Sequence, residues 1–214
     1  MSIEVTTKDC AALGDAELGE MADLTEGGVG WTVGQLGKQA EEWVLVSSAA
    51  KEGRLKGFMF TTLERIGGTP AMLIGLAATA PGKGNDAVLQ ALMKEQFHRA
   101  LMAFPDEDVL VAGRVIDRGG LDAFQELSEV CPCDDARANG EERAWGRRLS
   151  KRFGALGFDD RAMVARGDGE RLVIDHQSTG DLRSCGSVDG CDVESGDYVI
   201  AWGWAMVEHL ETLG

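Results

Sequence analysis

The stretch from Ala71 to Phe104 constrains the fold more than any other part of the chain. Ala71 to Ala78 is an apolar run bounded by Pro70 and Pro81. It is too short for a buried helix, so it predicts a strand covered on both faces. Apolar residues then recur at helical spacing: Val88, Leu89, Leu92, Met93, Phe97, Leu101 and Phe104. This periodicity predicts a long helix that ends before Pro105.

The turn between this strand and this helix, residues 81–86, reads Pro-Gly-Lys-Gly-Asn-Asp. Its two glycines permit backbone angles that other residues avoid. Backbone N–H groups and the positive end of the helix dipole then point at one place, which suits a phosphate group. A competing interpretation is that Asp86 caps the helix itself. Its charge about 4 Å from a phosphate charge would cost roughly 4 kcal/mol at an effective dielectric near 20, and Lys83 would offset part of this.

Residues 71–104 resemble the acyl-CoA-binding core of the GCN5-related N-acetyltransferase (GNAT) family, whose glycine turn holds the pyrophosphate of coenzyme A. Gly82-Lys83-Gly84 matches the centre of that turn, whereas Pro81 replaces an arginine and Asp86 replaces a small residue. The resemblance implies acetyl-CoA as cosubstrate, with its pantetheine along the strand. The residues expected to bind it are Leu76, Ala77, Ala78, Gly82, Lys83, Gly84, Asn85, Asp86 and Ala87.

The remaining elements follow the order of the GNAT fold. We expect strands at residues 3–7, 43–49, 55–66 and 109–116, helices at 8–24, 31–42 and 141–156, and a strand pair formed by 161–166 and 170–175. The resemblance therefore covers about residues 3–175. It implies an α/β fold with a GNAT-like mixed central sheet flanked by helices. We expect a GNAT-like acyltransferase domain at 1–176 and a C-terminal extension at 177–214.

The extension carries large apolar residues at every second position: Tyr198, Ile200, Trp202, Trp204 and Met206. This alternation predicts a strand with one broad apolar face. Such a face has to be covered, because an exposed one promotes aggregation. We expect it to pack on its own domain or on a second copy, with a homodimer slightly favoured.

Acyl transfer to an amine needs a base for the amine and an acid for the leaving thiolate. The candidates for the base are Glu64, near a strand hairpin, and Asp117, after the strand at 109–116. The resembled family often takes the acid from a tyrosine four residues before a Gly-Phe pair. In this chain the pair is Gly157-Phe158 and the position holds Phe153, which has no proton to donate.

In the resembled family, a helix–loop–helix near the N-terminus borders the acceptor pocket. The resemblance therefore suggests Trp31 and Glu26 as substrate-binding residues. For Trp31, simple packing on the sheet is the alternative.

Two functions follow from these patterns. The first is an acyl-CoA-dependent N-acetyltransferase that transfers acetyl to an unidentified small or peptide-borne amine. The alternative is a non-catalytic acyl-CoA-binding or vestigial GNAT-fold interaction protein. The retained glycine turn favours the first, and the replaced arginine, small residue and tyrosine favour the second.

The net charge of -15 repels nucleic acid and anionic lipid and attracts cations. Either a cationic acceptor or adaptation for solubility accounts for it. No apolar run approaches the roughly 20 residues that span a bilayer, and the first residues do not have the pattern of a signal peptide. We therefore expect a cytoplasmic protein without membrane partners. The spacings Cys131-x-Cys133 and Cys185-x5-Cys191 do not fit the usual zinc pattern, so we expect no metal.

Overall fold

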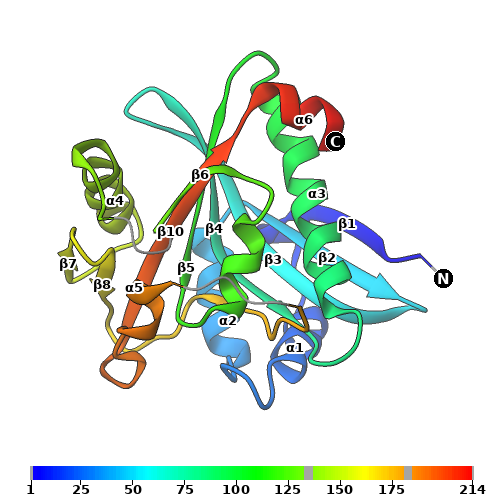
Figure 1. Cartoon of the computed structure of the whole chain (residues 1–214). Helices are drawn as coiled ribbons and strands as arrows, with labels where there is room; N and C mark the ends of the chain where they lie inside the picture. Colours follow the sequence, from blue (N-terminus) through cyan, green and yellow to red (C-terminus); the bar gives the residue numbers. More distant parts are fainter. Residues whose placement is uncertain (1, 133–136, 181–184, 214) are drawn as a thin grey trace.

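A computed structural model describes residues 2–132, 137–180 and 185–213 (Figure 1). Cys133, one of the cysteines considered above, lies outside these ranges. The elements in chain order are β1 (Glu4–Asp9), η1 (Cys10–Ala12), α1 (Asp15–Leu24), α2 (Val33–Glu42), β2 (Leu45–Lys51), β3 (Arg54–Ile66), β4 (Thr69–Thr79), α3 (Asn85–Ala103), β5 (Val109–Val115), η2 (Gly119–Phe124), β6 (Ser128–Cys131), α4 (Gly140–Arg152), β7 (Gly157–Asp159), β8 (Val164–Arg166), β9 (Ile174–Asp175), α5 (Gly186–Asp189), η3 (Val193–Ser195), β10 (Asp197–Ala205) and α6 (Val207–Leu213).

One mixed sheet organises these elements. Its main path runs β1-β2-β3-β4-β5-β10-β8-β7, while β6 pairs with β10 and β9 pairs with β4. Neighbours are antiparallel except that β4 runs parallel to β5 and to β9. This arrangement confirms the predicted α/β class with a mixed sheet flanked by helices.

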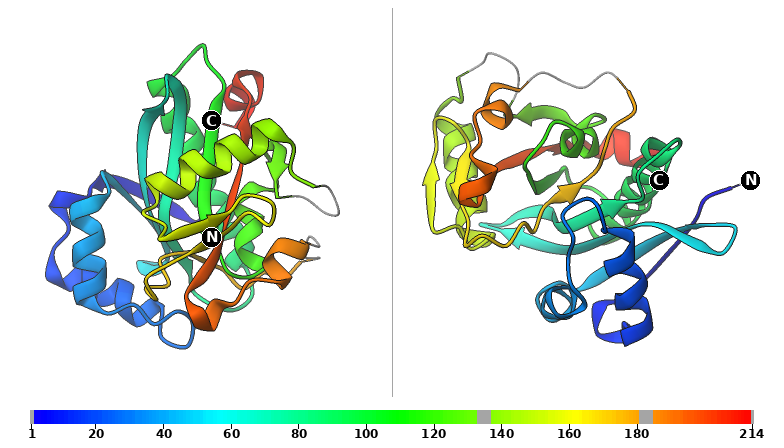
Figure 2. Two further views of the ribbon diagram at one scale, coloured as in Figure 1. Left: turned by 90° about the vertical axis from the view of Figure 1, so that its left-hand side faces the viewer. Right: turned by 90° about the horizontal axis from the view of Figure 1, so that it is seen from below.

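Helices cover both faces of the sheet. A Cβ atom on Gly57 would lie 2.7 Å from a methyl group of Val88, so this side of β3 packs on α3. The next residue, Phe58, points to the other face, where its ring packs edge-on against Trp31, which precedes α2. Figure 2 shows α1 and α2 on one side of the sheet and α3 on the other. None of the described helices is long and apolar enough to cross a membrane.

The C-terminal segment supplies an interior strand. β10 pairs antiparallel with β5 from Val199 opposite Val115 to Ala205 opposite Val109, and its other edge pairs with β8 and β6. The predicted strand is therefore confirmed, and it packs in the sheet of its own chain. The side chains of its apolar face are buried within the single chain, with Tyr198, Ile200 and Trp202 at most 5% exposed. The homodimer therefore stays a prediction without the support of an uncovered face.

The predicted helix over residues 8–24 is wrong in its first half. Lys8 and Asp9 pair with Val46 and Leu45 of β2, so they belong to strand β1. Helix α1 begins only at Asp15, after Gly14 as N-cap. Local sequence spacing did not reveal that β1 continues because its pairing partner is far away in the chain.

The predicted strand pair of residues 161–166 and 170–175 is also wrong. β8 pairs with β7 and β10 instead. Residues 174–175 form β9, which pairs with β4 in the middle of the molecule. This difference determines what the candidate site contains.

Candidate functional site

Strands β4 and β5 are paired only at one end. The ladder joins Ala71–Leu73 to residues 110–112, and β4 then continues to Thr79 without β5. In the cleft that opens, Ala77 lies opposite Ile174 of β9, and the Ala77 N–H donates to the Val173 carbonyl at 3.1 Å. A Cβ atom on Gly113 of β5 would lie 3.1 Å from Ile174 Cδ1. β9 thus fills the space between β4 and β5.

We call residues 171–179 the strap. In Figure 1 this yellow-orange part of the chain crosses the sheet and reaches the lower end of α3. Its middle is part of the core: Leu172, Val173, Ile174 and His176 are exposed by 8%, 1%, 0% and 1%. A strap anchored in this way is a structural element rather than a surface loop.

The first part of the strap binds the loop between α1 and α2. Trp31 Nε1 donates to the Arg171 carbonyl at 2.8 Å, and the Val29 N–H donates to Asp175 Oδ2 at 3.1 Å. Trp31 is buried and packs on Phe58. Of the two predicted acceptor residues, Trp31 therefore contacts the strap, while Glu26 is exposed in the same loop.

The second part of the strap binds the first turn of α3. Asn85 Nδ2 donates to the Gln177 carbonyl. Asp86 accepts two hydrogen bonds from Thr179, one from its hydroxyl and one from its N–H at 3.1 Å. Asn85 and Asp86, which were expected to bind coenzyme A, thus form hydrogen bonds with the strap instead.

The Asp86 carboxylate also lies near a buried histidine. His176 Nε2 is 3.0 Å from Asp86 Oδ1, and Thr79 Oγ1 is hydrogen-bonded to His176 Nδ1 at 2.7 Å. The hydroxyl of Thr179, and to a smaller extent its N–H and His176, lower the pKa of Asp86 below its usual value. Asp86 is therefore an anion that fixes the strap to α3.

Asp86 does not cap α3. The N-cap is Gly84, at a positive φ of 91°, and it provides no side-chain hydrogen bond. The interpretation of a self-capped helix is therefore wrong, because strap groups occupy the carboxylate. Gly82, Lys83 and Gly84 are exposed, so the turn expected to hold a pyrophosphate is accessible.

Asp117 lies beside the strap, two residues after β5. It shares a surface cavity of about 440 Å³ with His176, Gln177 and Ser178. Asp117 is exposed at the edge of this cavity, but partial desolvation of its carboxyl raises its pKa above the usual value, and Asp175 adds to the rise. The Gly120 N–H, which donates to Asp117 Oδ1 at 3.0 Å, opposes it. The structure thus places this predicted base beside His176 and Gln177, the strap residues that contact Asp86 and Asn85.

Glu64, the other predicted base, lies elsewhere. It stands opposite Ala71 at the start of β4, and Ala71 is five residues, or about 16 Å along the strand, before Leu76. Its carboxylate accepts two hydrogen bonds from Arg152, at 2.8 and 3.1 Å. The structure does not bring it together with the turn.

Among the described residues, Asp86, Asp122 and His176 have ligand-type atoms within 4.8 Å of one another. His176 Nε2 lies 3.7 Å from Asp122 Oδ2. The hydrogen bonds given above join the His176 ring to Thr79 and Asp86, and join Asp86 to Thr179. This cluster therefore forms part of the attachment of the strap.

The half-buried carboxyl of Asp175 gives a prediction about stability. Burial raises its pKa, so the folded state disfavours the ionised form, and this penalty is absent at a pH below the unfolded-state pKa. Asp175→Asn keeps an acceptor for Val29 and should raise the melting temperature at pH 7 by a few degrees. The gain should disappear near pH 3. Thermal melts across this range test it, with the exposed Asp106→Asn as the control.

A buried arginine holds β4 at the point where it leaves β5. Arg114 Nη2 donates to the Gly75 carbonyl at 2.7 Å, which satisfies a group that would otherwise pair with β5. Its guanidinium lies over the rings of Phe153 and Tyr198, 5.2 and 5.7 Å from their centroids. Burial lowers the pKa of Arg114. The guanidinium thus contacts both Tyr198, the single tyrosine of the sequence, and Phe153, which holds the position of the tyrosine in the resembled family.

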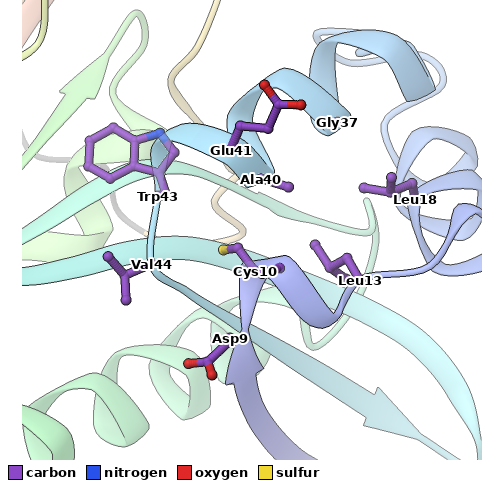
Figure 3. A pocket seen from close by; sticks show the side chains of 10 residues that line it. Asp9, Cys10, Leu13, Leu18, Gly37, Ala40, Glu41, Trp43 and Val44 are labelled. Carbon is purple, nitrogen blue, oxygen red and sulfur yellow. The ribbon is translucent and has the colours of Figure 1, made fainter.

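A second hollow lies on the face of α1 and α2 (Figure 3). It has a volume of about 750 Å³ and is bounded mainly by η1, α2 and Trp43. Apolar side chains line it together with the carboxylates of Asp9 and Glu41. This lining suits an organic cation with an apolar body. Neither Trp31 nor Glu26 belongs to it.

Sequence reasoning missed His176, Thr79, Thr179 and Arg114. No sequence pattern marks the first three, because their contacts join segments about 90 residues apart. Arg114 carried a signal: a charged residue inside the apolar run of β5 has to find partners.

No protein-family model and no curated protein sequence matches the chain. The solved structures similar to it include acetyltransferases. A putative GNAT-family acetyltransferase from Desulfovibrio desulfuricans has a TM-score of 0.45 at 10% identity, over 96% of this chain and 99% of that one. The IAA acetyltransferase from Bacillus cereus has a TM-score of 0.43 at 12% identity, over 95% of this chain and 100% of that one. The ribosomal-protein-S18-alanine N-acetyltransferase from Escherichia coli has a TM-score of 0.44 at 10% identity, over 64% of this chain and 86% of that one.

Proposed function

We propose that the protein is an acyl-CoA-dependent N-acyltransferase that transfers acetyl from acetyl-CoA to an amine. The observation that supports this best is the junction of β4 and α3. An exposed turn with two glycines at positive φ, 118° at Gly82 and 91° at Gly84, leads into a 19-residue helix whose N-cap makes no side-chain hydrogen bond. Such a helix start favours a bound anion.

The fit of acyl-CoA to this site is partial. The turn suits the pyrophosphate, and Lys83 on it supplies a positive charge. The strand does not suit the pantetheine as it stands, because Leu76, Ala77 and Ala78 are at most 1% exposed and β9 occupies the edge of β4. The proposed activity therefore requires the strap to leave this edge.

For the acceptor we propose a cationic amine, in agreement with the net charge of -15. Asp117 is the proposed base. A raised pKa makes the Asp117 carboxylate a stronger base, and the residue lines the same cavity as strap residues His176 and Gln177. Glu64 is the less favoured base because Arg152 neutralises it.

A binding experiment tests the proposal. Titration of coenzyme A into the protein at low ionic strength should show binding, and Lys83→Ala should weaken it about three- to tenfold through lost charge pairing with phosphate. Lys94→Ala is the matched control, because Lys94 is exposed on α3 beyond its first turn. Equal affinity of the Lys83 variant and the parent protein would contradict the proposed pyrophosphate position. Turnover of acetyl-CoA with a panel of amines then tests transfer.

A second candidate is a non-catalytic protein with this fold. The specific observation in its favour is that the strap occupies the cleft while Phe153 cannot donate a proton. On this view, neither the parent protein nor a variant with a loosened strap binds coenzyme A, and no amine is acetylated.

A further inference from the structure

We propose that the strap is an internal competitor of acyl-CoA: strap residues 173–179 take the same strand edge and helix start that the ligand would take, so only one of them is bound at a time. This inference rests on the proposed function and concerns the regulation of that site. It follows from the position of β9 and from the partners of the strap side chains.

The first argument is the strand edge. The Ala77 N–H is a donor on β4 where β5 has diverged, and the Val173 carbonyl accepts its hydrogen bond. β9 runs parallel to β4 in this place. A pantetheine arm has amide groups and would need the same donor, so the two cannot share the edge.

The second argument is the attachment at α3. Asp86, in the first turn of the helix, accepts both hydrogen bonds from Thr179, and Asn85 donates to the Gln177 carbonyl. The carboxylate that would repel a diphosphate is thus bound by the strap when the strap is in place. While the strap is in place, the negative charge of Asp86 stabilises the closed cleft.

The third argument is the distribution of burial along the strap. Gln177 and Thr179 are exposed, whereas Val173 and Ile174 are buried. Opening can therefore begin at the α3 end without first unfolding the core. Local opening of this kind costs less than global unfolding.

Two single substitutions should loosen the strap without changing the turn. A Cβ atom on Gly119 would lie 1.9 Å from the His176 carbonyl oxygen, so Gly119→Ala should push the strap away. Thr179→Val keeps the shape of the side chain and removes the hydroxyl hydrogen bond to Asp86, while the backbone N–H bond stays. Each variant should bind coenzyme A about tenfold more tightly than the parent protein, because more molecules have the open cleft. Gly19→Ala, where nothing lies within 4 Å, is the control.

A reversible lock tests the opposite direction. Ala78 and Asp175 are direct neighbours in the β4–β9 ladder, so the double variant Ala78→Cys/Asp175→Cys can place a disulfide across it. Coenzyme A should bind at least tenfold more weakly to the oxidised form than to the same protein after reduction. The single Ala78→Cys variant should not respond to reductant.

Hydrogen–deuterium exchange of the parent protein separates failure of this inference from failure of the proposed function. Saturating coenzyme A should speed exchange in the peptide containing residues 171–179, although bound ligands usually slow it. Coenzyme A binding with unchanged strap exchange would overturn the competition but leave the proposed function intact. No binding to any form, including the loosened variants, would overturn both.

Discussion

A chain shortened to end at Gln177 is expected to lose the cooperative fold. The truncation removes β10, which lies between β5 and β8, and Trp202, which is 2% exposed. An aromatic residue buries about 150–250 Å², and at about 25 cal/mol per Å² Trp202 alone contributes roughly 4–6 kcal/mol as an upper bound. Whole domains are stable by only about 5–15 kcal/mol. Near-ultraviolet circular dichroism and thermal melts should therefore show no cooperative unfolding.

A chain that ends at Met206 is the control for this truncation. It lacks only α6, which packs on α3 through the buried Leu210. We expect it to unfold cooperatively at a lower temperature than the full chain. If the chain ending at Gln177 instead melts cooperatively, residues 1–176 are an independent domain as the sequence suggested, and β10 is dispensable.

The sequence predicted the central strand, turn and helix because each leaves a local pattern. The apolar run of β4 and the helical spacing from Val88 to Phe104 are properties of adjacent residues. β10 was predicted for the same reason. The structure differs only slightly there, since α3 already begins at Asn85.

The position of β9 could not be predicted in this way. Residues 170–175 have strand composition, and they were expected to pair with the strand at 161–166, which lies just before them in the sequence. Their partner is β4, almost 100 residues earlier. A two-residue strand takes its place from long-range packing, here of Ile174 beside Gly113, and no local spacing encodes that choice.

The charged residues of the site show the same limit. From the sequence, Asp86 at the start of a helix was expected to cap it, because capping is a local interaction. In the structure, the Asp86 carboxylate instead accepts a hydrogen bond from Thr179, 93 residues later in the sequence. The sequence thus identified the residue, while the fold determined its partner.

The energetics of the strap set the expected affinity for acyl-CoA. Removing Val173 and Ile174 from the core costs about 1.5–3 kcal/mol each. A ligand that would bind the open cleft with micromolar affinity gains about 8 kcal/mol. When the cost of displacing Val173 and Ile174 is subtracted from this gain, the free energy that remains corresponds to a roughly millimolar dissociation constant for the closed protein. Weak binding by the parent protein and stronger binding by the loosened variants is therefore the pattern that the competition requires.

Gly75→Ala should be among the most destabilising single substitutions in the chain. Gly75 lies in β4 where the register with β3 shifts, and a Cβ atom there would lie 2.0 Å from Trp43 Cε2. The indole cannot move away easily: its N–H donates to Gln39 at 2.9 Å, and Arg152 lies over the ring. Overpacking usually costs about 1–3 kcal/mol, and we expect at least the upper value here.

The measurement is chemical denaturation of Gly75→Ala, of Trp43→Phe and of the double variant. A smaller ring leaves room for the added methyl group, so the two losses should not add, and the coupling should exceed about 1 kcal/mol in favour of the double variant. Gly19→Ala is the control: it lies in α1 with nothing within 4 Å, and it should gain about 0.5–1 kcal/mol from helix propensity. A Gly75→Ala protein as stable as the parent would mean that the indole does not lie on Gly75. The contact between Trp43 and the strand at the mouth of the cleft would then be wrong.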